Sequence, residues 1–384
     1  MNNIKNIAII VPSIERGGME RVASQLSFMF RDMGHHVYII VSRYDRKNAY
    51  EYAGKLIECP FEINNVGKKE ELLSYYYNSL MLKEIKKKYK INTTVSVAQE
   101  MNLINILSGT NDRKILTIHN CMSLRNDLNG CAYSKMAMKL YNCAYRIVVV
   151  SNWCKNDLIE NYRLKRRKVQ TIYNPSAKEC SYVNGKKKPI VLFVGRLDSV
   201  KQPWHVIKAF VKVKERVHNA ELWLAGNGPE RKKLERLVID MNIGDCVKFL
   251  GFVKNIDSLY DEARVLVMTS KSEAFPCVLV ETLAHCVPVV ISDIPGGARE
   301  CISKEMGDIL EYPKEVEAGI ITKNFGSLEP YSLNLISEEI MMGNEISRLL
   351  LNNELYLSKV NSCEELLQRF DNKVIAKQWE GIIR

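Results

Sequence analysis

Short apolar runs alternate with amphipathic stretches through the first half of the chain. Such runs are typical of strands that a sheet buries on both faces. They lie at 7–11, 37–41, 94–98, 115–118 and 147–150. Two of the stretches between them, 19–33 and 70–89, place apolar residues at helical spacing. The alternation predicts an α/β domain in which helices cover both faces of a parallel sheet.

The same pattern restarts in the second half, after a polar segment at 174–189 that is typical of a linker. Its apolar runs lie at 190–194, 222–225, 247–250, 264–268 and 287–291. Helical runs follow at 336–351, 363–369 and 373–383. Because 384 residues exceed what one core usually holds, we predict two domains, residues 1–178 and 186–371, with a final helix at 372–384.

Candidate ligand loops follow the predicted strands, and ligands of open parallel sheets bind at that edge. Gly17-Gly18 comes after the first strand and would let backbone N–H groups approach an anion. His119 follows the strand at 115–118 directly. Each signal is weak alone, because a lone histidine is more often a structural hydrogen-bonding group than a catalytic one.

Two glycine loops open the second domain. Gly195-Arg196 follows the strand at 190–194, and Lys201 follows five residues after Arg196, so the two cations could neutralise a diphosphate. The alternative is a pair of surface cations. The next loop, Gly226-Asn227-Gly228-Pro229, lacks the third glycine of the dinucleotide fingerprint, which argues against a dehydrogenase.

The segment 272–281 contains two carboxylates eight positions apart, Glu273 and Glu281. The apolar run at 264–268 predicts a buried strand before it, and Pro276 suits the first turn of a helix. Glu273 is therefore expected on a loop at a strand's carboxyl end, and Glu281 on the following helix. A helix N-terminus, which favours anions, would lie between them.

Composition places the chain among ordinary globular proteins and excludes a disordered one. No apolar run reaches membrane-spanning length, and the start of the chain does not resemble a signal peptide. The eleven cysteines form no Cys-x-x-Cys pair and no cluster at zinc spacing. We therefore expect a reducing, cytoplasmic environment with neither a disulfide framework nor a structural metal.

Charge is distributed unevenly. The net charge of +11 belongs to the first half, because residues 1–178 contain 28 Lys and Arg against 15 Asp and Glu. The excess is densest at 83–90 and 163–168, patterns that attract anionic lipid or nucleic acid. The alternative is a solvated helix face. No recognised nucleic-acid-binding motif is present, so a nucleic-acid partner is disfavoured.

These motifs together resemble family 4 of the retaining nucleotide-sugar glycosyltransferases, which have the GT-B fold: two Rossmann-like domains facing across a cleft. The resemblance spans nearly the whole chain, and the segment 272–281 followed by 287–290 is its most specific part. The fold implies that the last helix crosses back to the N-terminal domain. The residues that would pack there are Val374, Ile375, Trp379 and Ile382.

The resemblance also implies site residues. Glu281 would hold the donor ribose, while Arg196 and Lys201 would hold its diphosphate. Glu273 would lie at the sugar, and His119 near its reacting carbon. The catalytic residues would thus be His119, Glu273, Arg196 and Lys201. Further donor contacts would come from Gly17, Gly18, Gly195, Gly228, Val253, Phe275, Pro276, Cys277 and Val278. The base would lie near Val253. Two positions depart from the family pattern: Ala274, where glycine is usual, and Cys277, where asparagine is frequent.

The implied function is retaining transfer of a hexose or N-acetylhexosamine from a nucleotide diphosphate sugar, with UDP favoured by family habit. The acceptor would be a saccharide, lipid-linked in bacterial surface polysaccharide or glycoconjugate assembly. No Asp-x-Asp occurs, so neither a metal nor another cofactor is expected. The alternatives are a nucleotide-sugar epimerase or hydrolase on the same fold, and then a basic nucleic-acid-binding protein. The basic half, with the tyrosines at 75–77, suggests peripheral docking on the inner face of an anionic membrane, unless these tyrosines pack in the core.

Overall fold

A computed structural model describes residues 4–15, 17–63, 67–124, 132, 134–175, 187–305, 307–326 and 330–384. The chain divides into two compact units. The N-terminal unit comprises Met1–Pro175 with Lys373–Arg384, and the C-terminal unit comprises Ser176–Asn372. The expected linker falls almost entirely on residues 176–186, which lie outside the described residues.

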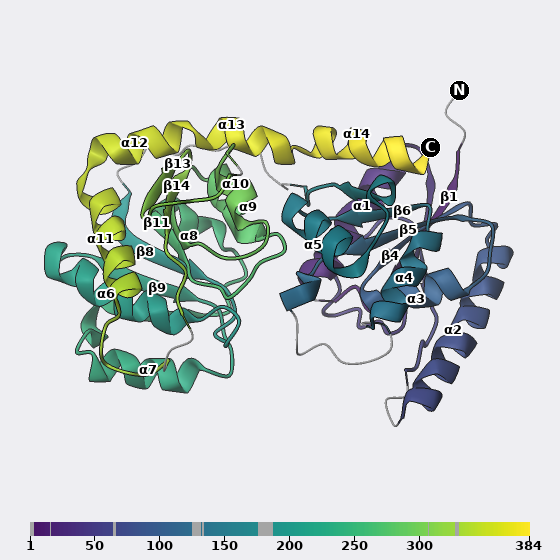
Figure 1. The fold of residues 1–384 in the computed structure, drawn as a ribbon, viewed down its shortest axis with the longest axis horizontal. Coiled ribbons are helices and arrows are strands. Elements are labelled where there is room, and N and C mark those ends of the chain that lie inside the picture. Colours follow the sequence, from purple (N-terminus) through teal and green to yellow (C-terminus); the bar gives the residue numbers. More distant parts are fainter. Residues whose placement is uncertain are drawn as a thin grey trace. The chain divides into compact units, whose positions relative to one another are not determined.

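The N-terminal unit is built on a parallel seven-stranded sheet with the order β3-β2-β1-β4-β5-β6-β7. Its strands are β1 (Asn6–Val11), β2 (His36–Val41), β3 (Lys55–Glu58), β4 (Thr93–Val97), β5 (Arg113–Ile118), β6 (Arg146–Val149) and β7 (Val169–Thr171). Its helices are α1 (Gly18–Asp32), α2 (Lys68–Lys88), α3 (Gln99–Leu107), α4 (Lys135–Leu140), α5 (Asn152–Tyr162) and, from the end of the chain, α14 (Asn372–Ile383). Figure 1 shows α14 beside α1.

The C-terminal unit repeats this plan with the order β10-β9-β8-β11-β12-β14-β13, in which only β13 runs antiparallel to its neighbour. Its strands are β8 (Lys188–Val194), β9 (Glu221–Ala225), β10 (Val247–Gly251), β11 (Ala263–Met268), β12 (Val289–Ser292), β13 (Lys314–Val316) and β14 (Gly319–Thr322). Its helices are α6 (Pro203–Arg216), α7 (Arg231–Asp240), α8 (Asp257–Glu262), α9 (Cys277–Ala284), α10 (Ala298–Ile302), α11 (Ser337–Leu351), α12 (Asn353–Asn361) and α13 (Cys363–Leu367).

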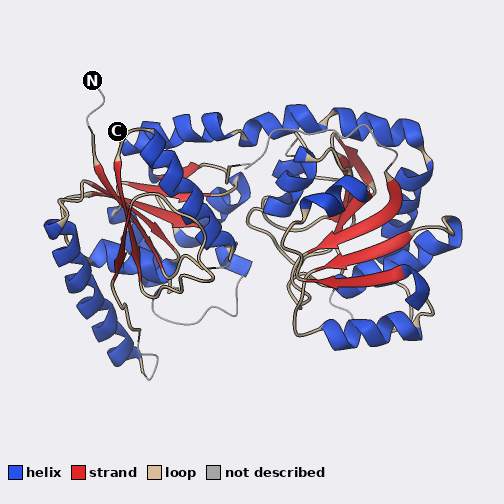
Figure 2. Ribbon diagram, turned by 180° about the vertical axis from the view of Figure 1, so that it is seen from behind, coloured by secondary structure: helices blue, strands red, loops and turns tan. Residues whose placement is uncertain are grey.

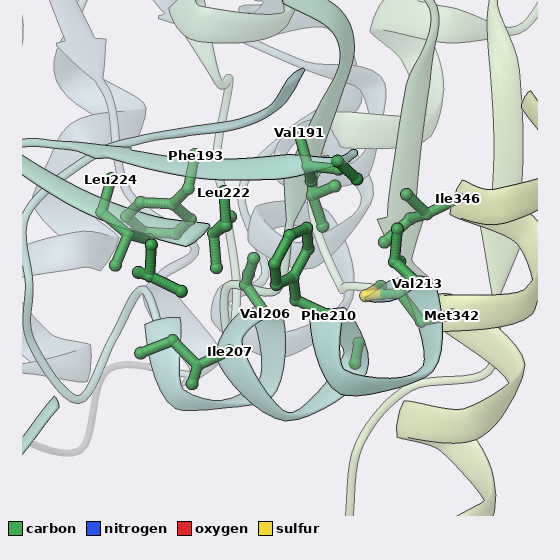
Figure 3. Packing of buried hydrophobic residues seen from close by; sticks show 14 of the residues in the cluster. Val191, Phe193, Val206, Ile207, Phe210, Val213, Leu222, Leu224, Met342 and Ile346 are labelled. Carbon is green, nitrogen blue, oxygen red and sulfur yellow. The ribbon is translucent and has the colours of Figure 1, made fainter. Parts of the chain in front are cut away.

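Both sheets are doubly wound, with the strand order reversing beside the first strand of each unit, which is the Rossmann-like arrangement. Helices flank the strands in each unit (Figure 2). This confirms the predicted α/β architecture. Figure 3 shows how one core forms, with apolar side chains of β8, β9, α6 and α11 pointing toward one another. Phe193 and Phe210 are almost fully buried there.

The last helix belongs to the core of the N-terminal unit, where Trp379 meets Phe30 edge to face at a centroid distance of 5.6 Å. Ile375 and Ile382 are buried with it. The expectation for Val374 is wrong, because this side chain is 43% exposed. Its position in α14 turns it away from the face that Trp379 and Ile375 share.

Candidate functional site

The loops that leave β8 and β11 meet at the point where the second sheet reverses its strand order, because these two strands pair directly. Ligands of doubly wound sheets bind outside the carboxyl ends of strands at such a point. Lys201 lies on the first loop and Glu273 on the second. The candidate site of the C-terminal unit is therefore built around these two residues.

Lys201 and Glu273 form an ion pair between Nζ and Oε1. The hydroxyl of Ser270 donates to the same carboxylate oxygen at 2.6 Å. The side chains of Lys201 and Glu273 are only 25% and 12% exposed. The structure thus brings together two residues that are 72 positions apart and that the sequence singled out separately. The ammonium of Lys201 is thus already paired with a carboxylate in a partly buried position at the sheet edge.

Asp198 shapes the loop that carries Lys201, although the sequence analysis did not single it out. Its Oδ1 accepts the backbone N–H of Val200 at 3.0 Å and that of Lys201 at 2.9 Å. Its Oδ2 pairs with the guanidinium of Arg196, which is 76% exposed. Arg196 therefore contacts Asp198 rather than Glu273, and its charge is presented to solvent at the rim of the loop.

Two predicted glycines allow the loop after β9 to pack against the loop after β8. A Cβ atom on Gly226 would lie 1.8 Å from the carbonyl oxygen of Gly195, and one on Gly228 would lie 2.3 Å from that of Leu197. Gly226 also has a φ of 144°, which side-chain-bearing residues rarely adopt. The N–H of Leu197 donates to Asn227 at 3.0 Å and completes the contact. These glycines therefore let the loop after β9 pack closely against the loop that carries Arg196 and Lys201.

The glycine loop after β12 is tied to the backbone of Glu273. The N–H of Glu273 donates to Pro295 at 3.1 Å, and the N–H of Gly297 donates back to Glu273 at 2.8 Å. At the start of this loop Asp293 accepts hydrogen bonds from Arg299, at 2.5 Å from Nε, and from the hydroxyl of Tyr312. Burial and the bond to Asp293 raise the pKa of Tyr312 to about 12, so its hydroxyl remains a donor.

The segment after Glu273 turns into helix α9, as predicted, with Pro276 at its N-cap and Cys277 as its first residue. Phe275 is 8% exposed and packs edge to face against Phe370, so its ring is covered by protein. Cys277 and Val278 are partly exposed at the start of the helix. One turn further, Glu281 accepts a hydrogen bond from the hydroxyl of Tyr260 at 3.0 Å.

Val253, where the base is expected, is half-buried in the loop after the edge strand β10. The N–H of Gly226 donates to the carbonyl of Gly251 at 2.7 Å, so this loop neighbours the β9 glycine loop. Phe252 beside Val253 is 69% exposed. An exposed aromatic ring next to a half-buried aliphatic side chain suits a flat heterocyclic base.

In the N-terminal unit, the predicted glycine pair lies at the carboxyl end of β1, where Gly17 is the N-cap of α1 and Gly18 its first residue. The carboxylate of Glu20 folds back toward this turn, because a Cβ atom on Gly17 would lie 2.0 Å from Glu20 Oε2. Burial raises the pKa of Glu20. A phosphate approaching Gly17 would therefore meet a carboxyl group that is easier to protonate than usual.

His119 lies at the carboxyl end of β5, with Nε2 2.9 Å from the hydroxyl oxygen of Thr117. That hydroxyl donates to the carbonyl of Ser96 at 3.0 Å. His119 Nε2 must then carry the proton, which leaves Nδ1 as an acceptor. Part of the residue is accessible to solvent, yet protein atoms surround the ring closely enough for desolvation to lower its pKa to about 4. The imidazole is neutral at physiological pH.

Acid should therefore destabilise the wild type more than a His119→Gln variant. Between about pH 6.5 and pH 4 the unfolded chain binds a proton at this position that the folded chain excludes, so stability falls as pH falls. We expect the wild type to lose roughly 3 °C more melting temperature than His119→Gln between neutral pH and pH 5. Thermal unfolding at the two pH values measures this difference.

The control for this experiment is His36→Gln, which changes an exposed histidine at the start of β2. It should lose as much melting temperature in acid as the wild type. Identical acid sensitivity of the wild type and His119→Gln would contradict a neutral, desolvated His119.

Within the ranges described, no three His, Cys, Asp or Glu residues gather closely enough to hold a metal ion. In the same part of the chain, no helix combines the length and the apolar character needed to cross a bilayer.

Two family models match the chain in sequence, one for each unit. Residues 16–176 match Glycosyltransferase Family 4, and residues 178–319 match Glycosyl transferases group 1. The chain belongs to these family 4 glycosyltransferases. It is similar to an uncharacterized glycosyltransferase of Methanocaldococcus jannaschii, with 29% identity over 65% of this chain and 67% of that protein.

A second relative is the N-acetylgalactosamine-N,N'-diacetylbacillosaminyl-diphospho-undecaprenol 4-alpha-N-acetylgalactosaminyltransferase of Campylobacter jejuni, 26% identical over 81% of this chain and 87% of that protein. Among solved structures, the fold is similar to that of Anabaena Alr3699/HepE in complex with UDP and glucose. The TM-score is 0.73, with 17% identity and 98% coverage of both chains. The protein is therefore a glycosyltransferase with the GT-B fold.

Proposed function

We propose that this protein transfers a hexose or an N-acetylhexosamine, with retention of anomeric configuration, from a UDP-linked donor to a saccharide acceptor. The observation that carries the proposal is the Lys201–Glu273 pair at the switch point of the C-terminal sheet, with Glu281 about one turn into α9. One cation for the diphosphate, one carboxylate for sugar hydroxyls and one for the ribose are the groups that a nucleotide-sugar donor requires. The UDP bound to the similar Anabaena protein supports the choice of base.

The proposed acceptor is a lipid-linked saccharide, as in the assembly of bacterial surface polysaccharide or other glycoconjugates. The support comes from the name of the Campylobacter jejuni relative, which describes an acceptor saccharide carried on diphospho-undecaprenol. The identity of 26% is too low to transfer the particular sugars. Ala274 and Cys277, which stand beside the proposed sugar site, are where we expect this chain to set its own sugar preference.

In the proposed reaction, the bond between the anomeric carbon and the diphosphate breaks while the acceptor hydroxyl attacks from the same face. The acceptor proton passes to the departing diphosphate. Lys201 and Arg196 would stabilise the negative charge that develops on this leaving group, which is usually the largest contribution of such a site. The neutral ring of His119, with Nδ1 as acceptor, suits a hydrogen bond from a sugar hydroxyl rather than a charge at the anomeric carbon.

A donor screen tests the proposal. Purified protein is incubated with a panel of nucleotide sugars and a mixture of lipid-linked acceptors, and released nucleoside diphosphate and products are followed together. We expect diphosphate release with one UDP-sugar, dependent on acceptor, and an α-configured product from an α-configured donor. Because Lys201 and Arg196 supply the positive charge, EDTA should change the rate by less than about twofold.

Each other outcome of the screen rejects a specific part of the proposal. An epimerised donor or free sugar without acceptor would indicate an epimerase or hydrolase. An inverted product would exclude the retaining course. A rate abolished by EDTA and restored by Mg²⁺ would exclude transfer without a metal.

A further inference from the structure

Helix α2 exposes a stripe of large apolar side chains to solvent, which is unusual for a surface helix. Its outward face carries six large apolar side chains, each between 39% and 61% exposed: Leu72, Leu73, Tyr76, Tyr77, Leu80 and Met81. They form two rows with a spacing of four residues, so they make one continuous stripe. The inward face places Tyr75 and Leu82 in the core, but its other buried residues are polar: Glu71, Ser74, Asn78, Ser79 and Lys86. A surface helix normally shows the opposite arrangement.

The inward polar face is fixed by hydrogen bonds, so the stripe cannot turn inward. Lys86 is 2% exposed, and its ammonium donates to Asn105 at 2.7 Å and to Ser108 at 3.0 Å. It also pairs with Asp112 at 3.1 Å. At the middle of the helix, Asn78 donates to the carbonyl of Glu62 at 2.8 Å. Rotating α2 would leave a buried carboxylate and amides unpaired, which is costly. The exposure of the stripe is therefore built into the fold.

The surroundings of the stripe are most basic at its C-terminal end. The exposed Lys87 and Lys88 follow it in the last turn of α2. The first turn is mixed, because Lys68 and Lys69 are followed there by Glu70 and Glu71. Lys86, by contrast, is buried and does not belong to this basic surface. Of the three consecutive tyrosines, Tyr75 is buried and the next two are exposed, so neither alternative for them holds as a whole.

The lysines beside the stripe indicate which kind of partner would cover it. A parallel second copy of the same stripe would bring the two lysine-rich C-terminal ends together, and like charges at an interface are unfavourable. An antiparallel copy would gain no net charge attraction, because Glu70 and Glu71 are offset by Lys68 and Lys69 in the first turn. An anionic bilayer has an apolar interior for leucine, methionine and tyrosine, together with phosphate headgroups for the lysines. Helix α2 also lies at the periphery of its unit (Figure 1).

We propose that the outward face of α2 inserts into the interfacial layer of an anionic membrane. The helix lies parallel to the membrane surface, with the stripe of residues 72–81 among the upper acyl chains and the terminal lysines at the headgroups. At 21 residues the helix is about 32 Å long. The inference does not depend on which donor and acceptor the enzyme uses.

Cosedimentation of the full chain with vesicles tests the proposal. Wild-type protein should bind phosphatidylglycerol-containing vesicles and bind pure phosphatidylcholine vesicles far less. Leu73→Ser combined with Tyr77→Ser should lower the partition coefficient at least about tenfold, because two inserted side chains are lost. Lys87→Glu combined with Lys88→Glu should also lower binding at least about tenfold, and only to the anionic vesicles.

The matched control is Ile239→Ser combined with Leu351→Ser, which removes two apolar side chains that are 66% and 62% exposed on α7 and α11. It should bind vesicles as the wild type does. All variants change exposed positions, and circular dichroism together with thermal unfolding confirms that each remains folded.

Equal vesicle binding by the wild type and the Leu73/Tyr77 variant would overturn the proposal. So would a wild type that ignores both kinds of vesicle. If such a protein formed a dimer in light scattering, and if that dimer were lost in the Leu73/Tyr77 variant, the partner of the stripe would be a second copy of the chain.

Discussion

Lys201→Ala should lower kcat by about 100- to 1,000-fold while the protein remains folded. The ammonium of Lys201 lies at the switch point of the C-terminal sheet and pairs with Glu273, so it is placed to stabilise charge on a leaving diphosphate. A stabilising contact that grows as the bond breaks affects kcat more than KM. Initial rates at saturating donor, with far-UV circular dichroism as the check on folding, measure the effect.

Lys188→Ala is the matched control, because it removes an ammonium from the opposite end of the same strand–loop element. Lys188 pairs with Glu262 at 2.5 Å, and both side chains are well exposed. Such surface pairs contribute little, so rate and stability should both stay near wild-type values. A Lys201→Ala enzyme with near-wild-type initial rates would remove Lys201 from the mechanism, and an unfolded one would show that its pairing with Glu273 is structural.

Gly226→Ala should reduce the free energy of unfolding by about 2 to 4 kcal/mol and weaken nucleotide binding. The added Cβ would lie 1.8 Å from the carbonyl oxygen of Gly195, and alanine rarely adopts the φ of 144° found at this position. The collision is between two backbones, so no flexible side chain can absorb it. The loop that carries Arg196 and Lys201 must shift instead. Urea unfolding and calorimetry with UDP measure the two effects.

Gly244→Ala provides the comparison, since a Cβ atom at that glycine would meet no other atom within 4 Å. It should change stability by less than about 0.5 kcal/mol. Equal losses in the two variants would mean that the effect of Gly226→Ala reflects glycine replacement in general. Full stability of Gly226→Ala would mean that the two loops do not approach each other this closely.

The central strands could be predicted from the sequence because each is buried on both faces and therefore appears as an apolar run. Other elements could not, and β3, β7, β13, β14 and α3 show why. The edge strand β3 has exposed ends, and β7 has only three residues, so neither forms a clear run. The pair β13 and β14 lies before the helical run at 336–351, in a part of the chain for which no element was predicted. Helix α3 escaped prediction because its inward face includes Asn102 and Asn105, whose amides are bonded to Thr117 and Ser96 at 2.9 and 3.1 Å.

Some residues of the candidate site could likewise be predicted from the sequence, and others could not. Lys201, Glu273 and Glu281 could be found because each follows or lies near an apolar strand within a short motif. Their supporting residues could not, because those contacts join segments distant in sequence. Tyr260 reaches Glu281 across 21 positions, and Tyr312 reaches Asp293 across 19. Asp198 stands between Arg196 and Lys201 in the sequence, but its role depends on the backbone N–H groups of Val200 and Lys201, which only the folded loop brings to its carboxylate.

The place of α14 in the chain has a consequence for the order in which the protein forms during synthesis. The core of the N-terminal unit includes Ile375 and Trp379, and the ammonium of Lys5 donates to the carbonyl of Ile383 at 2.5 Å. These partners leave the ribosome only after the whole C-terminal unit has been made. The first unit to be translated is therefore the last to be completed, and until then α1 exposes the surface around Phe30 that Trp379 later covers.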